Sequence, residues 1–370
     1  MKAISESPIT KGMRVIVRAD YNVPTKGTRI LDPRRIEASY KTIDFLLKKG
    51  ASIVLISHSK EESLKPVYTY LKKKYSTLSF AKTIEDIASD MKPRDIVLLE
   101  NIRAYEGEEK NDTAFAKKLA SLGSVYINDA FSVSHRKHAS VVGIPKYLPS
   151  FAGFSFAQEI KNLTLTDAQI KHPFVFILGG AKFGTKIPLI KKFIGKADSI
   201  VIAGAILNNF YKSAGFEIGS SVAEDGFDTQ IKKLLKDEKI LLPIDLIVLR
   251  KDAKVVTTPD AVLPGDCIVD IGPESTKLIV GLIGTAKLVV WNGPTGWYEK
   301  GFTKATKALA QSIVDSKAHA IVGGGDTGLL VEKILPENNK RIFVSTAGGA
   351  TLDFLANGTL PGIIALDKSK

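Results

Sequence analysis

Glycines that directly follow an apolar run are the first sign of chemistry in this chain. Residues 318–322 read Ala-His-Ala-Ile-Val, and Gly323-Gly324-Gly325-Asp326-Thr327 comes next. A strand that ends in glycines and then an acid is typical of a loop whose backbone N–H groups bind phosphate while the carboxylate holds a metal ion. The pattern indicates nucleotide chemistry, although a glycine turn that only lets a strand meet a helix is as common.

A second glycine turn carries lysines. The apolar run 174–178 precedes Gly179-Gly180-Ala181-Lys182-Phe183-Gly184-Thr185-Lys186, which lacks the spacing of a Walker A loop. Pro188 suits the first turn of a helix, so Lys182 and Lys186 should lie near the positive end of a helix dipole. This turn also favours phosphate.

A third turn lies between residues 291 and 299, Trp-Asn-Gly-Pro-Thr-Gly-Trp-Tyr-Glu. Here Glu299 could accept hydrogen bonds from a ribose. The alternative is a rigid Gly-Pro turn without a ligand.

Polar side chains follow four apolar runs in the first half of the chain. Asp20 and Asn22 come first, and an Asx-type turn closed by Pro24 is their alternative explanation. The other three sets are Ser57-His58, Glu100-Asn101-Ile102-Arg103, and Asn128-Asp129-Ala130-Phe131 with His135, Arg136 and His138. If these runs are parallel strands, the four sets converge on one rim.

Three arginines on this rim, Arg35, Arg103 and Arg136, offer planar forks that match phosphate or carboxylate. Their number exceeds what nearby acids at the strand ends would neutralise, so we expect an anionic small molecule. The histidines suggest a metal site as an alternative. No Cys or Glu completes a ligand set at zinc-like spacing, so hydrogen-bonding roles are favoured.

Positioning these residues requires strands that alternate with helices. Ten apolar, β-rich runs alternate with amphipathic stretches, the rhythm of a parallel sheet covered by helices on both faces. The rhythm occurs twice, and residues 154–166 keep a helical pattern between the two halves. We therefore predict two doubly wound, Rossmann-like α/β domains joined by a helix. The predicted strands are 14–18, 52–56, 95–99, 125–127, 174–178, 199–203, 246–249, 288–291, 320–322 and 342–345.

Composition limits the remaining classes. The chain has 370 residues and a net charge of +13, with 26 Lys+Arg against 17 Asp+Glu in residues 1–150 and 26 against 22 in the rest. The basic half favours anions, and short lysine clusters read as solvated helix faces rather than a nucleic-acid site. No run suggests a membrane span or a signal peptide, and the single Cys267 excludes an internal disulfide. We expect a cytoplasmic protein.

The ordered set of motifs resembles the phosphoglycerate kinase family over nearly the whole chain. The segments that carry the resemblance are 18–24, 98–103, 128–143, 178–186, 270–275, 291–299, 323–327 and 345–350. The resemblance implies reversible phosphoryl transfer between MgATP and 3-phosphoglycerate, giving ADP and 1,3-bisphosphoglycerate.

The resemblance also implies roles for individual residues. Asp20 and Asn22 would bind the hydroxyl and carboxyl end of the glycerate, His58, Arg103 and Arg136 would bind its phosphate, and Arg35 would face the transferring group. On the nucleotide side Lys186 would stabilise the moving phosphoryl group, which Gly325 also contacts, and Asp326 would bind Mg²⁺. The remaining nucleotide contacts would come from Lys182, Gly204, Val269, Asn292, Glu299, Gly324 and Thr327.

Domain organisation follows from the same resemblance. It implies a 3-phosphoglycerate-binding domain over residues 1–153, a hinge helix over 154–168 and a nucleotide-binding domain over 169–355. The tail 356–370 would pack back on the first domain. The family acts as a monomer by hinge bending, without nucleic acid or membrane partners, and closure would assemble the site and expel water.

Three departures from the family pattern stand out. After His58 the family has Leu-Gly-Arg-Pro, whereas this chain has Ser59-Lys60-Glu61-Glu62, so a phosphate-binding arginine is missing. We expect weaker phosphate binding there. Ala203-Gly204-Ala205 replaces a more glycine-rich turn and Ala347 replaces a glycine, and both changes could narrow the nucleotide site.

Two alternatives stay open at this point. The missing arginine motivates a catalytically impaired paralogue that retains nucleotide binding. The excess of basic residues in the first half motivates a nucleic-acid-binding protein, which would show salt-dependent binding but for which the sequence has no recognition motif.

Overall fold

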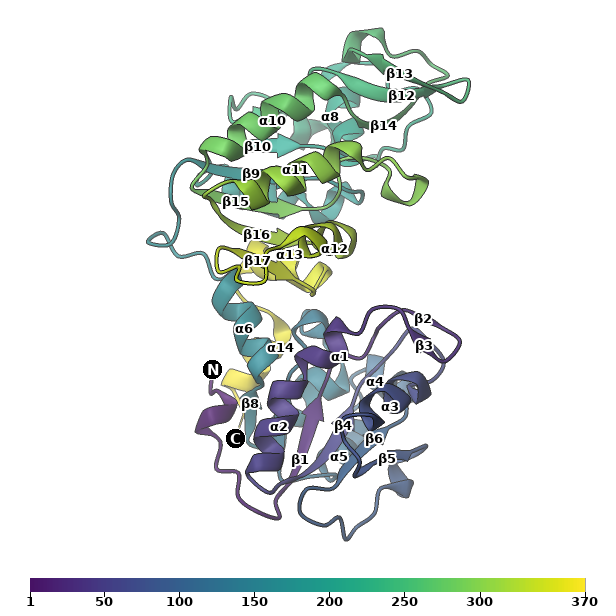
Figure 1. The fold of residues 1–370 in the computed structure, drawn as a ribbon, viewed down its shortest axis with the longest axis vertical. Coiled ribbons are helices and arrows are strands. Elements are labelled where there is room, and N and C mark those ends of the chain that lie inside the picture. The colour runs from purple at the N-terminus through teal and green to yellow at the C-terminus, as the bar shows by residue number, and fades with distance from the viewer. Residues whose placement is uncertain (370) are drawn as a thin grey trace. The chain divides into compact units, whose positions relative to one another are not determined.

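The computed structural model describes residues 1–369, with the side chain of Asp326 left out. The chain forms two compact units. The first contains Met1–Lys161 and the C-terminal residues from Asn357 onward, and the second contains Asn162–Ala356. The prediction of two parallel-sheet α/β domains is confirmed (Figure 1).

The first unit is built on a six-stranded parallel sheet in the order β5-β6-β4-β1-β7-β8. Strand β4 reads Ser-Ile-Val-Leu-Ile and is buried along its whole length, as expected of a strand covered on both faces. The strands are β1 Arg14–Arg18, β4 Ser52–Ile56, β5 Leu78–Ala81, β6 Ile96–Leu99, β7 Val125–Asn128 and β8 Ser150–Ala152, with a separate hairpin of β2 Thr25–Lys26 and β3 Arg29–Ile30.

Helices cover both faces of this sheet. On one face Val15, Val17 and Leu55 share a buried cluster with Ile43 and Leu71 of the covering helices. On the other face Tyr126 is buried and its hydroxyl donates to Ser140 O, 2.7 Å away. The helices of this unit are α1 Arg34–Ala38, α2 Tyr40–Lys48, α3 Lys65–Lys72, α4 Glu106–Glu109, α5 Thr113–Ala120, α6 Phe154–Leu163 and α14 Pro361–Asp367, with shorter turns η1 Ile4–Glu6, η2 Ile84–Asp86, η3 Ile102–Ala104, η4 Phe131–Val133, η5 Ala139–Gly143 and η6 Ile144–Lys146.

The second unit has a parallel sheet in the order β11-β10-β9-β15-β16-β17. In chain order this is 3-2-1-4-5-6, the arrangement of a doubly wound nucleotide-binding sheet, and the strand order reverses between β9 and β15. Helices α10 and α11 lie on the face nearest the viewer in Figure 1. The strands are β9 Phe174–Leu178, β10 Ser199–Ile202, β11 Ile240–Leu241, β15 Leu288–Asn292, β16 His319–Gly323 and β17 Ile342–Ser345. The helices are α7 Ile187–Phe193, α8 Ile206–Ala214, α9 Asp228–Leu234, α10 Pro273–Thr285, α11 Lys304–Asp315, α12 Gly325–Ile334 and α13 Gly349–Asn357, with turns η7 Phe183–Thr185, η8 Pro259–Ala261 and η9 Tyr298–Lys300.

One predicted strand lies in a different sheet. Residues 246–249 belong to β12 (Leu246–Arg250), which pairs antiparallel with β13 (Ala253–Thr257) and β14 (Cys267–Ile271). The prediction that this run joins the parallel sheet is wrong, because Lys251 and Asp252 adopt positive φ of 48° and 65° and turn the chain straight back. Three parallel strands, β5, β8 and β11, were not predicted, since they are short and two of them contain Ser and Ala.

Both crossings between the units fall within helices. The first unit gives way to the second after Lys161, inside α6, and the chain returns inside α13. Helix α6 ends at Leu163, so the residues from 164 to 168 are not helical, in contrast to the predicted span of 154–168. The hinge role of this helix stays a prediction.

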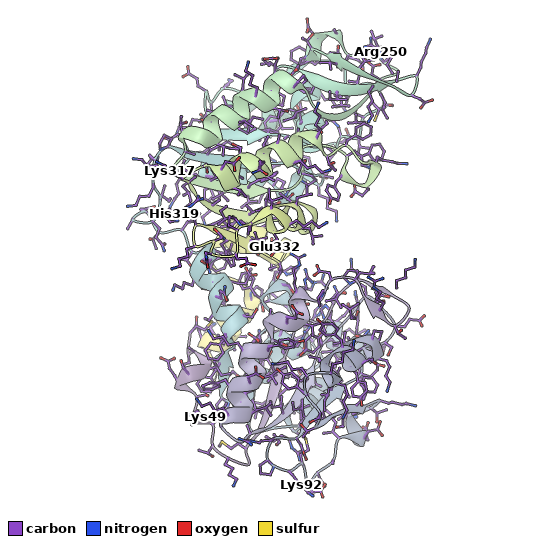
Figure 2. All side chains as sticks on the ribbon, in the orientation of Figure 1. Lys49, Lys92, Arg250, Lys317, His319 and Glu332 are labelled. Carbon is purple, nitrogen blue, oxygen red and sulfur yellow. The ribbon has the colours of Figure 1, made fainter. Side chains whose placement is uncertain are left out.

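Charged side chains lie at the edges where strands begin as well as at the opposite ends. Lys49 precedes β4 and Lys92 precedes β6, and both are exposed and project from the ribbon (Figure 2). In the second unit the exposed His319 begins β16. Part of the positive charge of the chain is therefore solvated and distant from the strand ends that carry the predicted site.

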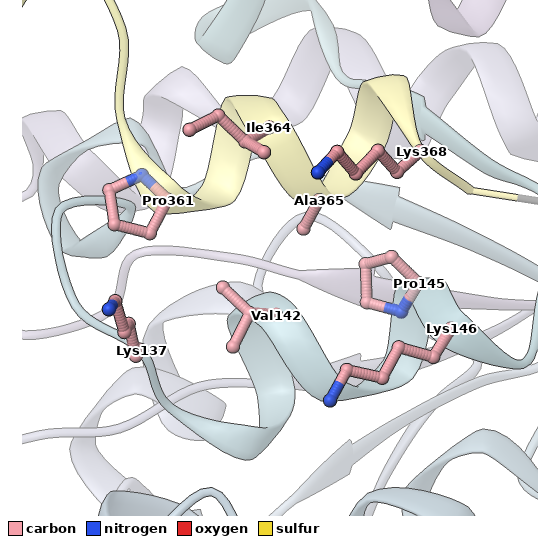
Figure 3. Close-up of a pocket in the computed structure, with 8 residues that line it drawn as sticks. All are labelled: Lys137, Val142, Pro145, Lys146, Pro361, Ile364, Ala365 and Lys368. Carbon is pink, nitrogen blue, oxygen red and sulfur yellow. The ribbon is translucent and has the colours of Figure 1, made fainter.

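Helix α14 packs against η5 and η6 and leaves a partly open pocket of about 300 Å³ between them (Figure 3). Val142, Pro145 and Ile364 form apolar walls, and Lys146 and Lys368 lie at its edge. Lysine stems cover apolar surface while their ammonium groups stay in water. We interpret the pocket as a gap left where α14 packs against η5 and η6, rather than as a ligand site.

Candidate active site

The first unit brings the predicted anion-binding residues to four adjacent strand ends. Strands β6, β4, β1 and β7 are neighbours in the sheet and all run in the same direction. Asp20 and Asn22 follow β1, His58 follows β4, Arg103 lies in η3 after β6, and Arg136 follows β7 and η4. Arg35 lies in α1. The sheet topology therefore collects these side chains on one edge.

Asp20 contacts side chains from two other segments of this group. One of its carboxylate oxygens accepts a hydrogen bond from Ser132 Oγ at 2.5 Å and pairs with Arg35 Nη1 at 3.2 Å. Arg35 Nη1 also lies 3.3 Å from the carbonyl oxygen of Asn22. Asn22 Oδ1 accepts the backbone N–H of Lys60 at 3.0 Å. The loop after β1, helix α1 and the loop after β4 are thus joined at one point.

The arginines differ in how their charge is compensated. Arg103 pairs with Glu109 of α4 at 2.7 Å, and Arg35 pairs with Asp20 at 3.2 Å, so acids partly compensate the charge of two of the three arginines. Arg136 forms no ion pair with any residue in the described range 1–369, and its Nε lies 3.4 Å from His135 Nε2. Arg136 therefore offers the least compensated guanidinium of the three to an anion.

His58 is neutral and its tautomer is fixed. The side chain is buried, with 2% exposed, and Arg18 Nη2 lies 2.8 Å from His58 Nδ1. A guanidinium only donates, so Nδ1 accepts and the ring proton lies on Nε2. Burial, with the charges of Arg18 and Arg136, lowers the pKa of His58 to about 2. His58 can therefore donate a hydrogen bond to an anion near neutral pH without carrying charge.

A histidine–glutamate cluster lies beside this residue. Potential ligand atoms of His58, Glu108 and His138 lie within 4.8 Å of one another, so the fold places beside the histidines a Glu that the sequence spacing does not mark. However, Glu108 accepts the hydroxyl and the N–H of Ser140, and the guanidinium of Arg18 occupies the accepting nitrogen of His58. A cation next to a guanidinium is unfavourable, so a hydrogen-bonded network fits these residues better than a metal site.

The second unit places two glycine turns side by side where its strand order reverses. Gly179 N–H donates to Asn292 O and Gly180 N–H donates to Pro294 O, both at 2.8 Å. A Cβ on Gly179 would lie 2.2 Å from Pro294 O, so a side chain there would force the two turns apart. Ligands of such sheets bind outside the carboxyl ends of the strands at this point.

The two lysines of the first turn occupy different environments. Lys186 is 5% exposed, and its ammonium group donates to Asn292 Oδ1. Burial lowers the pKa of Lys186 to about 8. Lys182 is exposed and has a positive φ of 64°. Glu224 holds the loop between them by accepting the N–H groups of residues 183 and 184 at 2.8 and 3.1 Å.

The glycine run after β16 opens α12. Gly324 has a φ of 104°, and a Cβ built on Gly325 would meet no atom within 4 Å, so the backbone of this turn is open on that side. Thr327 is fully buried, and its hydroxyl has no partner among the described residues. An open backbone and an unpaired hydroxyl in the first turn of a helix fit a phosphate. The Asp326 side chain, predicted to hold Mg²⁺, lies outside the described residues.

One loop connects the residues predicted around the adenine and the ribose. Gly204 N–H donates to Thr295 O at 2.9 Å, and Trp297 N–H donates to Val269 O at 2.7 Å. Glu299, predicted to bind the ribose, is exposed in η9 at the end of this loop. The structure therefore brings Gly204, Val269 and the loop of residues 293–299 into one neighbourhood.

The alanines that depart from the family pattern suit the local backbone. Gly204 and Gly348 adopt positive φ of 62° and 54°, a conformation that favours glycine. Ala203, Ala205 and Ala347 are not among the described residues with positive φ. Glycine is retained where the backbone requires it.

Comparisons with known proteins agree with this arrangement. The family model described as phosphoglycerate kinase matches residues 6–358. The chain belongs to the phosphoglycerate kinase family. Phosphoglycerate kinases from Moorella thermoacetica and Borrelia garinii are both 39% identical to it. The alignment covers 95% of this chain and 96% of the Moorella protein, and 100% of both chains for Borrelia.

Solved structures of phosphoglycerate kinases are similar to the whole chain. The structure from Coxiella burnetii has a TM-score of 0.84 at 33% identity and covers 100% of this chain and 99% of that chain. The structure from Pyrococcus horikoshii has a TM-score of 0.85 at 25% identity, with 99% and 98% covered. The predicted kinase class and the use of a nucleotide substrate are confirmed by family membership. No helix among the described residues has the length and apolarity required to cross a membrane.

Several residues that hold the predicted site residues in place were not singled out from the sequence. Arg18 orients His58, Ser132 holds Asp20, and Glu224 holds the lysine loop. Arg18 lies inside a recognised motif, but no local pattern marks Glu224, which is 41 residues from its partner Phe183. Such contacts arise from the tertiary fold and leave no periodic signal in the sequence.

Proposed function

We propose that this chain catalyses reversible phosphoryl transfer between MgATP and 3-phosphoglycerate, giving ADP and 1,3-bisphosphoglycerate. The observation that carries the proposal is the match to the phosphoglycerate kinase family over residues 6–358, which includes the polar strand ends of both units. No specific observation favours the impaired paralogue, since Arg35, Arg136 and Lys186 are all present and each has a polar partner.

The first unit supplies the acid-binding half of the reaction in this proposal. Asp20 and Asn22 bind the hydroxyl and carboxyl end of the glycerate, and His58, Arg103 and Arg136 bind its phosphate. Uncompensated charge on Arg136 and the neutral N–H donor of His58 support this assignment. Arg35, held by Asp20, faces the transferring group.

The second unit supplies the nucleotide half. Gly324, Gly325 and Thr327 bind phosphates, which the open backbone and the unpaired hydroxyl support. Gly204 and Val269 bind the adenine and Glu299 binds the ribose. Lys182, Lys186 and Asn292 act on the phosphates, and Asp326 holds Mg²⁺, which would neutralise charge on the phosphate oxygens when bound.

The reaction proceeds by positioning and charge neutralisation. A carboxylate is already a nucleophile, so no base is required to deprotonate it and no covalent intermediate is needed. We propose in-line transfer after hinge closure, which would exclude water from the transferring group. Family membership also supports a monomer in the cytoplasm as part of this proposal.

A coupled assay for MgATP-dependent phosphorylation of 3-phosphoglycerate tests the proposal. Wild type should turn over. Lys186→Ala should lower kcat strongly, because it removes the positive charge proposed to stabilise the phosphoryl group in transfer. Arg136→Ala should mainly raise KM for 3-phosphoglycerate. Lys182→Ala run in parallel should mainly raise KM for nucleotide. If the two lysine variants exchange these phenotypes, their roles are reversed. A wild-type protein that binds nucleotide but does not turn over would contradict the kinase proposal.

A further inference from the structure

The loop between β15 and η9 is fastened by a buried hydrogen-bonded chain of three side chains. Thr295 is 1% exposed, and its hydroxyl donates to Asp270 Oδ1 at 2.9 Å. Its backbone N–H donates to Thr306 Oγ1 at 3.1 Å, and the two threonine hydroxyl oxygens lie 2.9 Å apart. Asp270 belongs to β14 and Thr306 to α11. These hydrogen bonds therefore join the loop to both β14 and α11 at Thr295.

The proton positions in this chain follow from the donors. Since the Thr295 hydroxyl gives its proton to the Asp270 carboxylate, the contact between the two hydroxyls must use the proton of Thr306. Thr306 then accepts from the Thr295 N–H and donates to the Thr295 hydroxyl. Every polar group of Thr295 is therefore used, because its carbonyl oxygen accepts from Gly204.

Close packing fixes the loop on either side of Thr295. A Cβ on Gly296 would lie 2.5 Å from the carboxyl carbon of Asp270, so the loop backbone rests directly on this carboxylate. One residue later, Trp297 N–H donates to the carbonyl of Val269. The loop cannot move relative to β14 without breaking these contacts.

The same loop sets the positions of the proposed nucleotide contacts. It binds the turn at Gly204 through Thr295 O and the turn at Gly180 through Pro294 O, and it continues to Glu299. We propose that Asp270, Thr295 and Thr306 are positioning residues for nucleotide binding, which act by fixing this loop. The inference rests on the proposed function, since it assumes that these turns contact the nucleotide.

Removal of the Thr295 hydroxyl alone tests the inference. Thr295→Val keeps the shape of the side chain but removes the hydroxyl that contacts both Asp270 and Thr306, while the backbone N–H to Thr306 remains. We expect Kd for MgADP, measured by isothermal titration calorimetry, to rise at least tenfold, with KM for 3-phosphoglycerate unchanged within twofold. Thr295→Ser retains the hydroxyl and should stay within threefold of wild type.

Matched variants separate positioning from loss of stability. Thr276→Val removes a hydroxyl that donates to Gly272 O at 2.8 Å in α10, outside the loop, and should leave Kd for MgADP unchanged. If Thr295→Val does not fold, Thr306→Ser and Thr306→Ala repeat the test at the other threonine of the hydrogen-bonded network. An unchanged Kd in folded Thr295→Val and Thr306→Ala would overturn the inference. Absence of turnover in wild type would instead count against the proposed function, since calorimetry does not require catalysis.

Discussion

Lys60 stands where the family pattern has an arginine, and the structure keeps it next to the proposed glycerate site. Its backbone N–H donates to Asn22 Oδ1, and its side chain is exposed beside Glu61 and Glu62. Lysine is a point charge that cannot form the two parallel hydrogen bonds of a guanidinium. The acidic neighbours reduce its attraction for phosphate further.

We predict that Lys60→Arg lowers KM for 3-phosphoglycerate roughly tenfold, because a charge-assisted hydrogen bond contributes about 1.5–3 kcal/mol. Steady-state kinetics with varied 3-phosphoglycerate at saturating MgATP measure the effect. Lys60→Gln should raise KM with kcat unchanged. Equal KM values for wild type and both variants would mean that this loop does not reach the phosphate.

Lys186 combines a proposed catalytic role with a cost to stability. Burial lowers its pKa from 10.5 to about 8 in the folded protein. Between these pH values the unfolded chain binds more protons than the folded chain, so stability rises as pH increases across this window. At neutral pH the buried ammonium group costs about 3 kcal/mol, from a pKa difference at about 1.4 kcal/mol per pH unit.

We predict that Lys186→Met removes this cost and increases the free energy of unfolding at pH 7, while turnover is lost. The advantage of the variant over wild type should shrink as pH rises from 7 towards 10. Urea denaturation followed by circular dichroism at several pH values measures both effects. Lys191→Met, which changes an exposed lysine of α7, the helix that begins directly after Lys186, provides the control. A stability difference that does not vary with pH would argue against a buried charge at Lys186.

At the scale of elements, Asp129 connects helix α6 to the sheet of the first unit. It follows β7 directly, and its Oδ1 accepts the N–H groups of Ser155 and Phe156 in the first turn of α6, at 2.9 and 3.2 Å. A Cβ on Gly153 would lie 2.3 Å from the same oxygen, so glycine allows the approach. Burial raises the pKa of Asp129 from 3.8 to about 7.

This raised pKa makes the attachment of α6 sensitive to pH. Between about pH 4 and 7 the folded protein retains a proton that the unfolded chain releases, so the contribution of Asp129 to stability is present at low pH and falls as pH rises. We predict that the stability of wild type relative to Asp129→Asn decreases by up to about 4 kcal/mol from pH 4 to 8. Urea denaturation monitored by circular dichroism tests this. Asp112→Asn controls for replacing a capping carboxylate, and a flat difference would contradict the assignment.

The sequence predicted elements best where a strand is fully buried and carries a long apolar run. Strands such as 52–56 and 174–178 were predicted with their observed bounds, because both of their faces are covered. Short edge strands such as β8 have no such signal, and the apolar run at 246–249 does not reveal which sheet it joins. That choice depends on the positive φ of Lys251 and Asp252, which no glycine or asparagine in the sequence marks.

The sequence predicted which strand ends carry the proposed site residues, but it did not predict the hydrogen-bond and ion-pair partners of those residues. Polar residues after apolar runs are visible in the sequence, whereas the pairing of Arg103 with Glu109 and of Lys186 with Asn292 is set by the fold. Asn292 is 106 residues from Lys186. Only the parallel register of β9 and β15 brings the two residues together.

At the scale of the whole molecule, the proposed acid-binding and nucleotide-binding residues belong to different compact units. Each set is supported by its own sheet, at residues 20–138 in the first unit and 179–327 in the second. A ligand that binds one folded unit lowers the free energy of that unit and protects its amides from local opening. The two ligands should therefore leave separate footprints.

We predict that hydrogen exchange separates the two half-sites. With 3-phosphoglycerate alone, protection should rise in segments 19–24, 57–62, 100–104 and 128–138, because these are the strand ends proposed to bind the acid. With MgADP alone, protection should rise in segments 179–186, 203–206, 292–299 and 323–328. Exchange measured by mass spectrometry on wild type and Arg136→Ala tests this, since the variant should lose only the first footprint at subsaturating 3-phosphoglycerate. Protection of the second set by 3-phosphoglycerate alone would show that the proposed division of the site between the units is incorrect.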